Sequence, residues 1–166
     1  HYLEMGIKVG MGVDGQASAD ISDPFENMRM GLYALRMKHQ SAKIMQPIDI
    51  LRLHTIRTAE ILGVASQVGS LAEGKYADFL IIDPQKPATG PVNNPVATLV
   101  FSCSADNIEA VYVAGEVKVL EGEVLGHDAG ALAAEVVRRR DAIIARRPPG
   151  PPRAPPPSPR ARPAPR

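Results

Sequence analysis

Asp14 is the residue of this sequence whose type and position best suit a chemical role. It follows residues 7–13, whose alternating apolar pattern predicts a short strand, and it precedes Gly15, a residue typical of turns. A carboxylate at the end of a strand can bind a divalent metal or carry a proton. An Asp-Gly pair after a strand is also a common turn, so the pair taken alone favours a structural role.

Other candidate groups are sparse. Ser18 and Asp20 lie on the polar segment after the Asp-Gly pair and could face a substrate, but we favour loop hydrogen bonding or helix capping for both. A catalytic zinc site typically needs three protein ligands plus water. The sequence has four histidines and no His-x-His pair: His1, His39, His54 and His127. We expect His39 and His54 to occupy ordinary positions in or beside helices.

Composition is typical of a globular protein of one ordinary domain. The chain has 166 residues, of which 45% are hydrophobic and 22% are charged. No apolar run is long enough to cross a bilayer, and we expect a cytoplasmic protein. Cys103 is the single cysteine, so no internal disulfide can form, and we expect this residue to be buried as a small apolar side chain.

Charge is divided unevenly along the chain. Residues 146–166 contain six Arg, ten Pro and no acidic residue, whereas the preceding residues have 13 basic against 18 acidic side chains. This mildly acidic body gives no indication of a nucleic-acid groove. The tail has too few apolar residues to fold, and we predict a disordered extension. The alternative is a ligand for a proline-recognising domain.

Local signals predict the elements that must position Asp14. Ser22-Asp23-Pro24 predicts a helix start, and the spacing of Phe25, Met28, Leu32 and Leu35 predicts one buried helix face ending near Lys38. Pro47 opens a second helical region, with Ile48, Leu51, Ile56 and Ala59 as its apolar members and Gly63 as its end. We predict strands at residues 77–83, 97–102, 109–113, 117–120 and 124–125, and a terminal helix over residues 129–145.

Three segments resemble the C-terminal end of the amidohydrolase superfamily. They are TAEILGV (residues 58–64), VGSLAEGKYADFLIID (residues 68–83) and NIEAVYVAGEVKV (residues 107–119). VGMGVDGQASAD, residues 9–20, is similar to the last barrel strand and metal-site loop of the cytosine-deaminase-like, guanine deaminase and triazine hydrolase branch. The resemblance covers residues 6–127, and its motifs indicate the superfamily better than the substrate.

The resemblance implies an α/β fold, the C-terminal fragment of a (β/α)8 TIM-type barrel with the C-terminal share of a composite β-sandwich domain. In such barrels the catalytic groups lie at the carboxyl ends of the strands, where Asp14 would stand. The implied division is residues 1–65 for the last barrel strand and helices, residues 66–127 for the sandwich strands, residues 128–145 for a terminal helix and residues 146–166 for the tail.

The implied activity is metal-dependent hydrolysis of C–N bonds other than peptide bonds, in cyclic amidines such as nucleobases or triazines. A divalent metal, zinc rather than iron, would activate water, and Asp14 would bind the metal and carry the proton to the departing amine. The other ligands would lie on earlier barrel strands, outside this chain. The implied partners are a small heterocyclic substrate, the N-terminal part of the same protein and possible further copies of it, with no nucleic acid and no membrane.

Two alternatives to an enzyme fragment that is inactive alone stay open. One is a non-enzymatic β-rich interaction module, degenerate from the enzyme, that uses its tail for binding. The other is a subunit that completes its barrel with a separately encoded N-terminal half. Upstream sequence distinguishes them, because an in-frame His-x-His pair would support the enzyme and a native start near Met5 would support the module.

Overall fold

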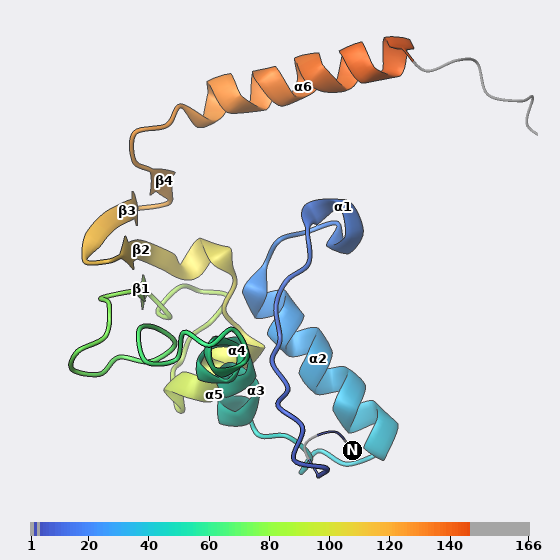
Figure 1. Ribbon diagram of the computed structural model, residues 1–166, viewed down its shortest axis with the longest axis vertical. Helices are drawn as coiled ribbons and strands as arrows, with labels where there is room; N and C mark the ends of the chain where they lie inside the picture. The colour runs from blue at the N-terminus through green and yellow to red at the C-terminus, as the bar shows by residue number, and fades with distance from the viewer. Residues whose placement is uncertain (1, 3, 147–166) are drawn as a thin grey trace, which may run out of the picture. The chain divides into compact units, whose positions relative to one another are not determined.

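A computed structural model describes residue 2 and residues 4–146 (Figure 1). The chain divides into two compact units, residues 1–126 and residues 127–166. The first unit contains α1 (Gln16–Ala19), α2 (Pro24–His39), α3 (Pro47–His54), α4 (Ile56–Ile61), β1 (Phe79–Ile82), α5 (Pro95–Phe101), the 3-10 helix η1 (Ala105–Asn107), β2 (Ile108–Val113), β3 (Glu116–Leu120) and β4 (Glu123–Val124). The second contains α6 (Ala129–Arg146). The mixed α/β class is confirmed; the predicted tail beyond Arg146 lies outside the described residues.

Helix α2 forms where the sequence predicts it. The Asp23 carboxylate accepts hydrogen bonds from the backbone N–H of Phe25 at 2.8 Å and of Glu26 at 3.4 Å, which satisfies donors that a helix start leaves unpaired. Pro24 occupies the first turn, where its missing N–H costs nothing. Three of the predicted apolar positions are buried: Phe25, Met28 and Leu32.

The second helical region differs from the prediction, because it is two helices separated at Thr55. This residue has φ −122° and ψ −101°, which no α-helix accommodates. The Thr55 hydroxyl donates to the carbonyl oxygen of Leu51 at 2.8 Å, a local bond that competes with helical hydrogen bonding. The buried side chains are Ile50, Leu53 and Ala59, whereas Ile48 is 39% exposed.

The core of the first unit lies where α2, α3 and α5 pack together. Its buried members are Phe25, Met28, Leu32, Ile50, Leu53, Val100 and Cys103. The predicted strand over residues 97–102 is wrong, because this segment is helix α5. The Asn94 side chain caps the helix by accepting from the N–H of Ala97 at 3.0 Å. Cys103 is 1% exposed, which confirms its expected burial.

Four antiparallel strands form one sheet in the order β1-β2-β3-β4 (Figure 1). Ile81 lies opposite Ala110 in the first pair, and Val111 lies opposite Val119 in the second. Ala114 and Gly115 join β2 to β3 with φ of 51° and 81°, the positive values that a tight hairpin turn requires. The four strands predicted from residue 77 onward, other than residues 97–102, are thus confirmed as β1 to β4. The expected burial of β1 is wrong, because β1 is an edge strand whose Leu80 is 47% exposed.

Residues 7–13 do not form the predicted strand. The segment belongs to no sheet of the described chain, because a strand needs a neighbouring strand to accept and donate its backbone hydrogen bonds. The backbone of Met11 instead bonds to a helix, because its N–H donates to the carbonyl oxygen of Leu53 in α3 at 2.9 Å. The alternating pattern therefore predicted an extended conformation but not the bonding partner.

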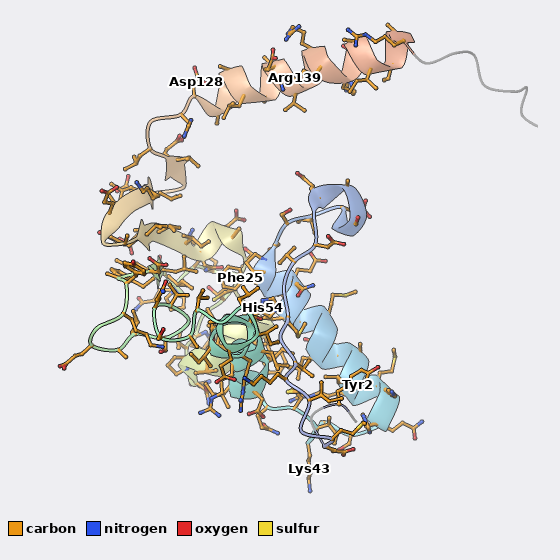
Figure 2. All side chains as sticks on the ribbon, viewed as in Figure 1. Tyr2, Phe25, Lys43, His54, Asp128 and Arg139 are labelled. Atoms are coloured by element: carbon orange, nitrogen blue, oxygen red, sulfur yellow. The ribbon has the colours of Figure 1, made fainter. Side chains whose placement is uncertain are left out.

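Helix α6 confirms the predicted terminal helix and extends to Arg146. Asp128 precedes it and accepts from the N–H of Ala131 at 2.9 Å, and Glu135 pairs with both Arg138 and Arg139 (Figure 2 labels Asp128 and Arg139). No residue of this helix is buried within the described chain. Within residue 2 and residues 4–146, the structure has no helix long and apolar enough to span a membrane.

Candidate functional site

Asp14 lies exposed at the end of the extended segment, immediately before α1. Its Oδ1 accepts a hydrogen bond from the backbone N–H of Gly15 at 2.7 Å. A carboxylate offers about four lone-pair positions on its two oxygens, so this single bond leaves room for a cation or a proton. The same bond is one that a purely structural Asp-Gly turn would make.

Two packed glycines hold the segment before Asp14 against the helices. A Cβ added at Gly10 would lie 3.0 Å from the Cα of Thr58, and one added at Gly31 of α2 would contact the side chain of Met11. Met11 is itself partly buried against the core cluster. The extended segment is therefore packed between α2 and α4 just before it delivers Asp14.

A pocket of about 240 Å³ lies beside this segment at the start of α2. Its lining residues are Val13, Ile21, Asp23, Glu26, Asn27 and Met30. The Oδ1 atom of Asn27 is buried and has no hydrogen-bond partner within the described chain. Oxygen acceptors in a concave site suit a ligand that carries N–H or O–H groups.

Sequence reasoning missed Glu26 and Asn27. The available signal was helical spacing, because Asp23, Asn27 and Met30 recur at four- and three-residue steps and so share one side of α2. Those positions match no sequence motif. The other side of the pocket is formed by Val13 and Ile21, which only the fold places beside α2.

The two loop residues considered with Asp14 do not converge on it. Ser18 is exposed, and its backbone N–H donates to the carbonyl oxygen of Gly15 at 2.8 Å. Asp20 is also exposed and ends α1 with a φ of 61°. Both are thus engaged in the local geometry of the α1 turn.

The histidines lie away from the Asp14 loop in the sequence and on separate elements. His39 is the exposed last residue of α2, and His127 is exposed at the start of the second unit. His54 ends α3 at the junction with α4 (Figure 2), where its Nε2 is buried and has no partner within the described residues. Burial lowers the pKa of His54 and so favours the neutral imidazole. His1 lies outside the described residues.

A divalent metal needs several donor side chains gathered in one place. Across the described part of the chain, no three His, Cys, Asp or Glu side chains come together as a metal-binding group. Asp14 nevertheless has the chemistry of one ligand, an exposed carboxylate with acceptor capacity left on its oxygens. It would therefore fit a metal only as one member of a larger ligand set.

Curated deaminases are similar to this chain over part of their length. This chain is 34% identical over 126 residues to the 5-methylthioadenosine/S-adenosylhomocysteine deaminase of Pyrococcus abyssi. The matched region is 76% of this chain and 29% of that protein. The chain is 39% identical over 122 residues to the enzyme of the same name from Bacillus cereus, covering 73% and 28%. The chain thus spans under a third of the length of these relatives.

Two solved structures are also similar to this chain. An adenosine deaminase from Xanthomonas campestris with bound zinc matches with a TM-score of 0.82 at 26% identity, over 86% of this chain and 33% of that one. The zinc-bound atrazine chlorohydrolase of Arthrobacter aurescens matches with a TM-score of 0.75 at 28% identity, over 82% and 30%. The model of the amidohydrolase family matches residues 1–118, which include Asp14 and its flanking loop. The chain belongs to the amidohydrolase family.

Proposed function

We propose that this chain is the C-terminal part of a zinc-dependent deaminase of cyclic amidines, in which Asp14 binds the metal and carries a proton. The observation that carries the proposal is the exposed Asp14 carboxylate at the end of the packed segment 7–13, inside the region that matches the family. Two structural neighbours named with zinc favour that metal over iron.

When bound, the metal supplies an activated water by lowering the pKa of that water from about 15.7 to roughly 7. Asp14 then accepts the proton of the water as the oxygen adds to the ring carbon. The same carboxyl returns the proton to the ring amino group, which leaves as ammonia when the C–N bond breaks. The bond from the Gly15 N–H holds one oxygen of Asp14 in place during both transfers.

The substrate class is proposed from the relatives. The names of the two deaminases refer to adenosine derivatives, and the structural neighbours are named for adenosine and for atrazine. All of these ligands contain an aromatic ring carbon flanked by nitrogens, the kind of carbon that water can attack. An N–H or O–H group of such a ligand would suit the carboxylate of Glu26 in the neighbouring pocket.

The remaining metal ligands are proposed to come from a longer polypeptide. In this arrangement residues 1–65 complete a (β/α)8 barrel and residues 66–127 contribute to a β-sandwich domain. The short coverage of the relatives supports this reading, since the matched region is under a third of each of them. The 166-residue chain by itself is then expected to be inactive.

The test uses the complete polypeptide that carries this chain, purified with zinc, and measures ammonia release. The substrates are 5-methylthioadenosine, S-adenosylhomocysteine, adenosine and an aminotriazine. Asp14→Asn should lower kcat by about a hundredfold or more, the usual contribution of a general acid–base group. Asp20→Asn, on the same loop, is the matched control and should keep the wild-type rate. Release of no ammonia from any substrate would refute the deaminase; full activity and full zinc content in Asp14→Asn would refute the role of Asp14.

A further inference from the structure

Thr58 on α4 joins the segment that delivers Asp14 to the helical part of the first unit. Its Oγ1 accepts a hydrogen bond from the backbone N–H of Met11 at 3.2 Å. The same hydroxyl lies 3.0 Å from the carbonyl oxygen of Met11 and 2.7 Å from that of Leu53, so it can donate to either. One side chain thereby contacts both backbone polar groups of Met11.

The break between α3 and α4 makes this contact possible. The last four carbonyl groups of a helix have no partner within the helix, and Leu53 is the next-to-last residue of α3. Its carbonyl oxygen receives the N–H of Met11 at 2.9 Å and lies within reach of the Thr58 hydroxyl. An unbroken helix would use this carbonyl internally, so the irregular Thr55 creates the acceptor that holds the extended segment.

Packing reinforces the hydrogen bonds. Gly10 lies so close to Thr58 that an added Cβ would also meet the Thr58 hydroxyl and, at 3.1 Å, the side chain of Ile61. Asp14 is three residues beyond Met11, a reach of at most about 10 Å in extended chain. Within the described chain, Met11 is the nearest residue on the N-terminal side of Asp14 whose backbone is hydrogen-bonded to the helices.

We propose that Thr58 is a positioning residue: its hydroxyl fixes the backbone at Met11 and thereby the place at which Asp14 meets the metal and the substrate. Its catalytic consequence rests on the proposed function. The hydroxyl, rather than the volume of the side chain, carries the effect. Thr58→Val removes the hydroxyl and keeps the shape, whereas Thr58→Ser keeps the hydroxyl.

The first experiment measures backbone amide hydrogen exchange in the 166-residue chain. Thr58→Val should speed exchange at Met11 by roughly two- to fivefold relative to Val111 in β2, because the Met11 N–H loses one of its two acceptors and keeps Leu53, and Thr58→Ser should restore protection. Thr89→Val is the matched control, because it removes a hydroxyl that bonds the carbonyl oxygens of Pro84 and Lys86 and not Met11. Equal exchange at Met11 in wild type and Thr58→Val would overturn the anchor.

The second experiment measures steady-state kinetics in the complete polypeptide. Thr58→Val should lower kcat by about ten- to a hundredfold with little change in KM, since a small displacement of a reacting group has effects of this size. Thr58→Ser should recover kcat, and Thr89→Val should keep it. Faster exchange with unchanged kcat would overturn the positioning role. A wild-type protein without deaminase activity would refute the proposed function, and the exchange result alone would then decide whether Thr58 holds the segment.

Discussion

Arg29 on α2 donates a hydrogen bond from Nη2 to the carbonyl oxygen of Cys103 at 3.1 Å. Its Nη1 donates at 3.2 Å to the carbonyl oxygen of Phe101, the last residue of α5. The carbonyl end of a helix carries partial negative charge, which the guanidinium neutralises while it satisfies an unpaired acceptor. One side chain thus ties the beginning of the first unit to a helix more than sixty residues later.

Replacing this guanidinium should destabilise the first unit. We expect Arg29→Met to lower the free energy of unfolding by about 2 kcal/mol, because hydrogen bonds to charged groups are stronger than neutral ones. Urea denaturation checks the value. Arg52→Met is the control, because Arg52 is exposed and its ion pair with Asp49 is long, at 3.9 Å. This variant should lower the free energy of unfolding by under about 0.5 kcal/mol. Equal losses in the two variants would contradict the proposed tie.

Gly10 and Gly12 should respond oppositely to the same substitution. Gly10→Ala places a Cβ 3.0 Å from the Cα of Thr58, so the backbone must shift, and we expect a loss of about 1–3 kcal/mol. Nothing lies within 4 Å of a Cβ at Gly12, and Gly12→Ala should be neutral or stabilise by up to about 1 kcal/mol through the unfolded chain. Urea midpoints compare the pair. A Gly10→Ala variant as stable as Gly12→Ala would show that the segment is not packed against α4.

Asp23 should stabilise α2 through its cap. Asp23→Ala removes the acceptor for the N–H groups of Phe25 and Glu26, and we expect a loss of about 1 kcal/mol. Asp23→Ser keeps a capping oxygen and should recover most of the loss. Thermal unfolding followed by circular dichroism measures both variants. Ser22→Ala, at the exposed preceding residue, serves as the control; a loss as large as that of Asp23→Ala would point to a general effect of the loop.

His54 should make the stability depend on pH. Burial lowers its folded pKa below the ordinary value of 6.5, so the unfolded chain takes up a proton more readily than the folded one. The stabilisation is therefore complete above pH 6.5 and is lost as the pH falls through the lower, folded pKa. Comparing the free energy of unfolding at pH 8 and pH 5.5 tests this, and His54→Leu should show a smaller decrease than wild type. The same decrease in both proteins would exclude His54 as the source.

Local sequence signals determined the elements whose stabilising contacts lie within a few residues. Helix α2 needs only the Asp23 cap, Pro24 and the three- and four-residue apolar spacing. The β2–β3 hairpin needs alternating side chains and a turn that tolerates positive φ at Ala114 and Gly115. The helix and the two strands were predicted because the signal for each lies in consecutive residues.

A short apolar run was predicted as a strand although a helix-start signal precedes it. Residues 97–102 contain Thr98 and Val100, whose β-branched side chains favour strands, yet Pro95 and the Asn94 cap make the segment helical. Packing of Val100 into the core then fixes the helix. Propensity was overridden because burial of one helical face outweighs the small preferences of individual residues.

The sequence by itself determined that Asp14 ends an extended apolar segment and precedes a turn. Which groups hold that segment was decided only by tertiary structure. The alternating pattern determines which way side chains point, but the backbone groups bond to any partner that the fold brings beside them. Here the partners are the Leu53 carbonyl in the last turn of α3 and the hydroxyl of Thr58. Met11 and Thr58 are 47 residues apart. No periodic pattern indicates this contact, because the two residues lie in separate segments with independent local signals.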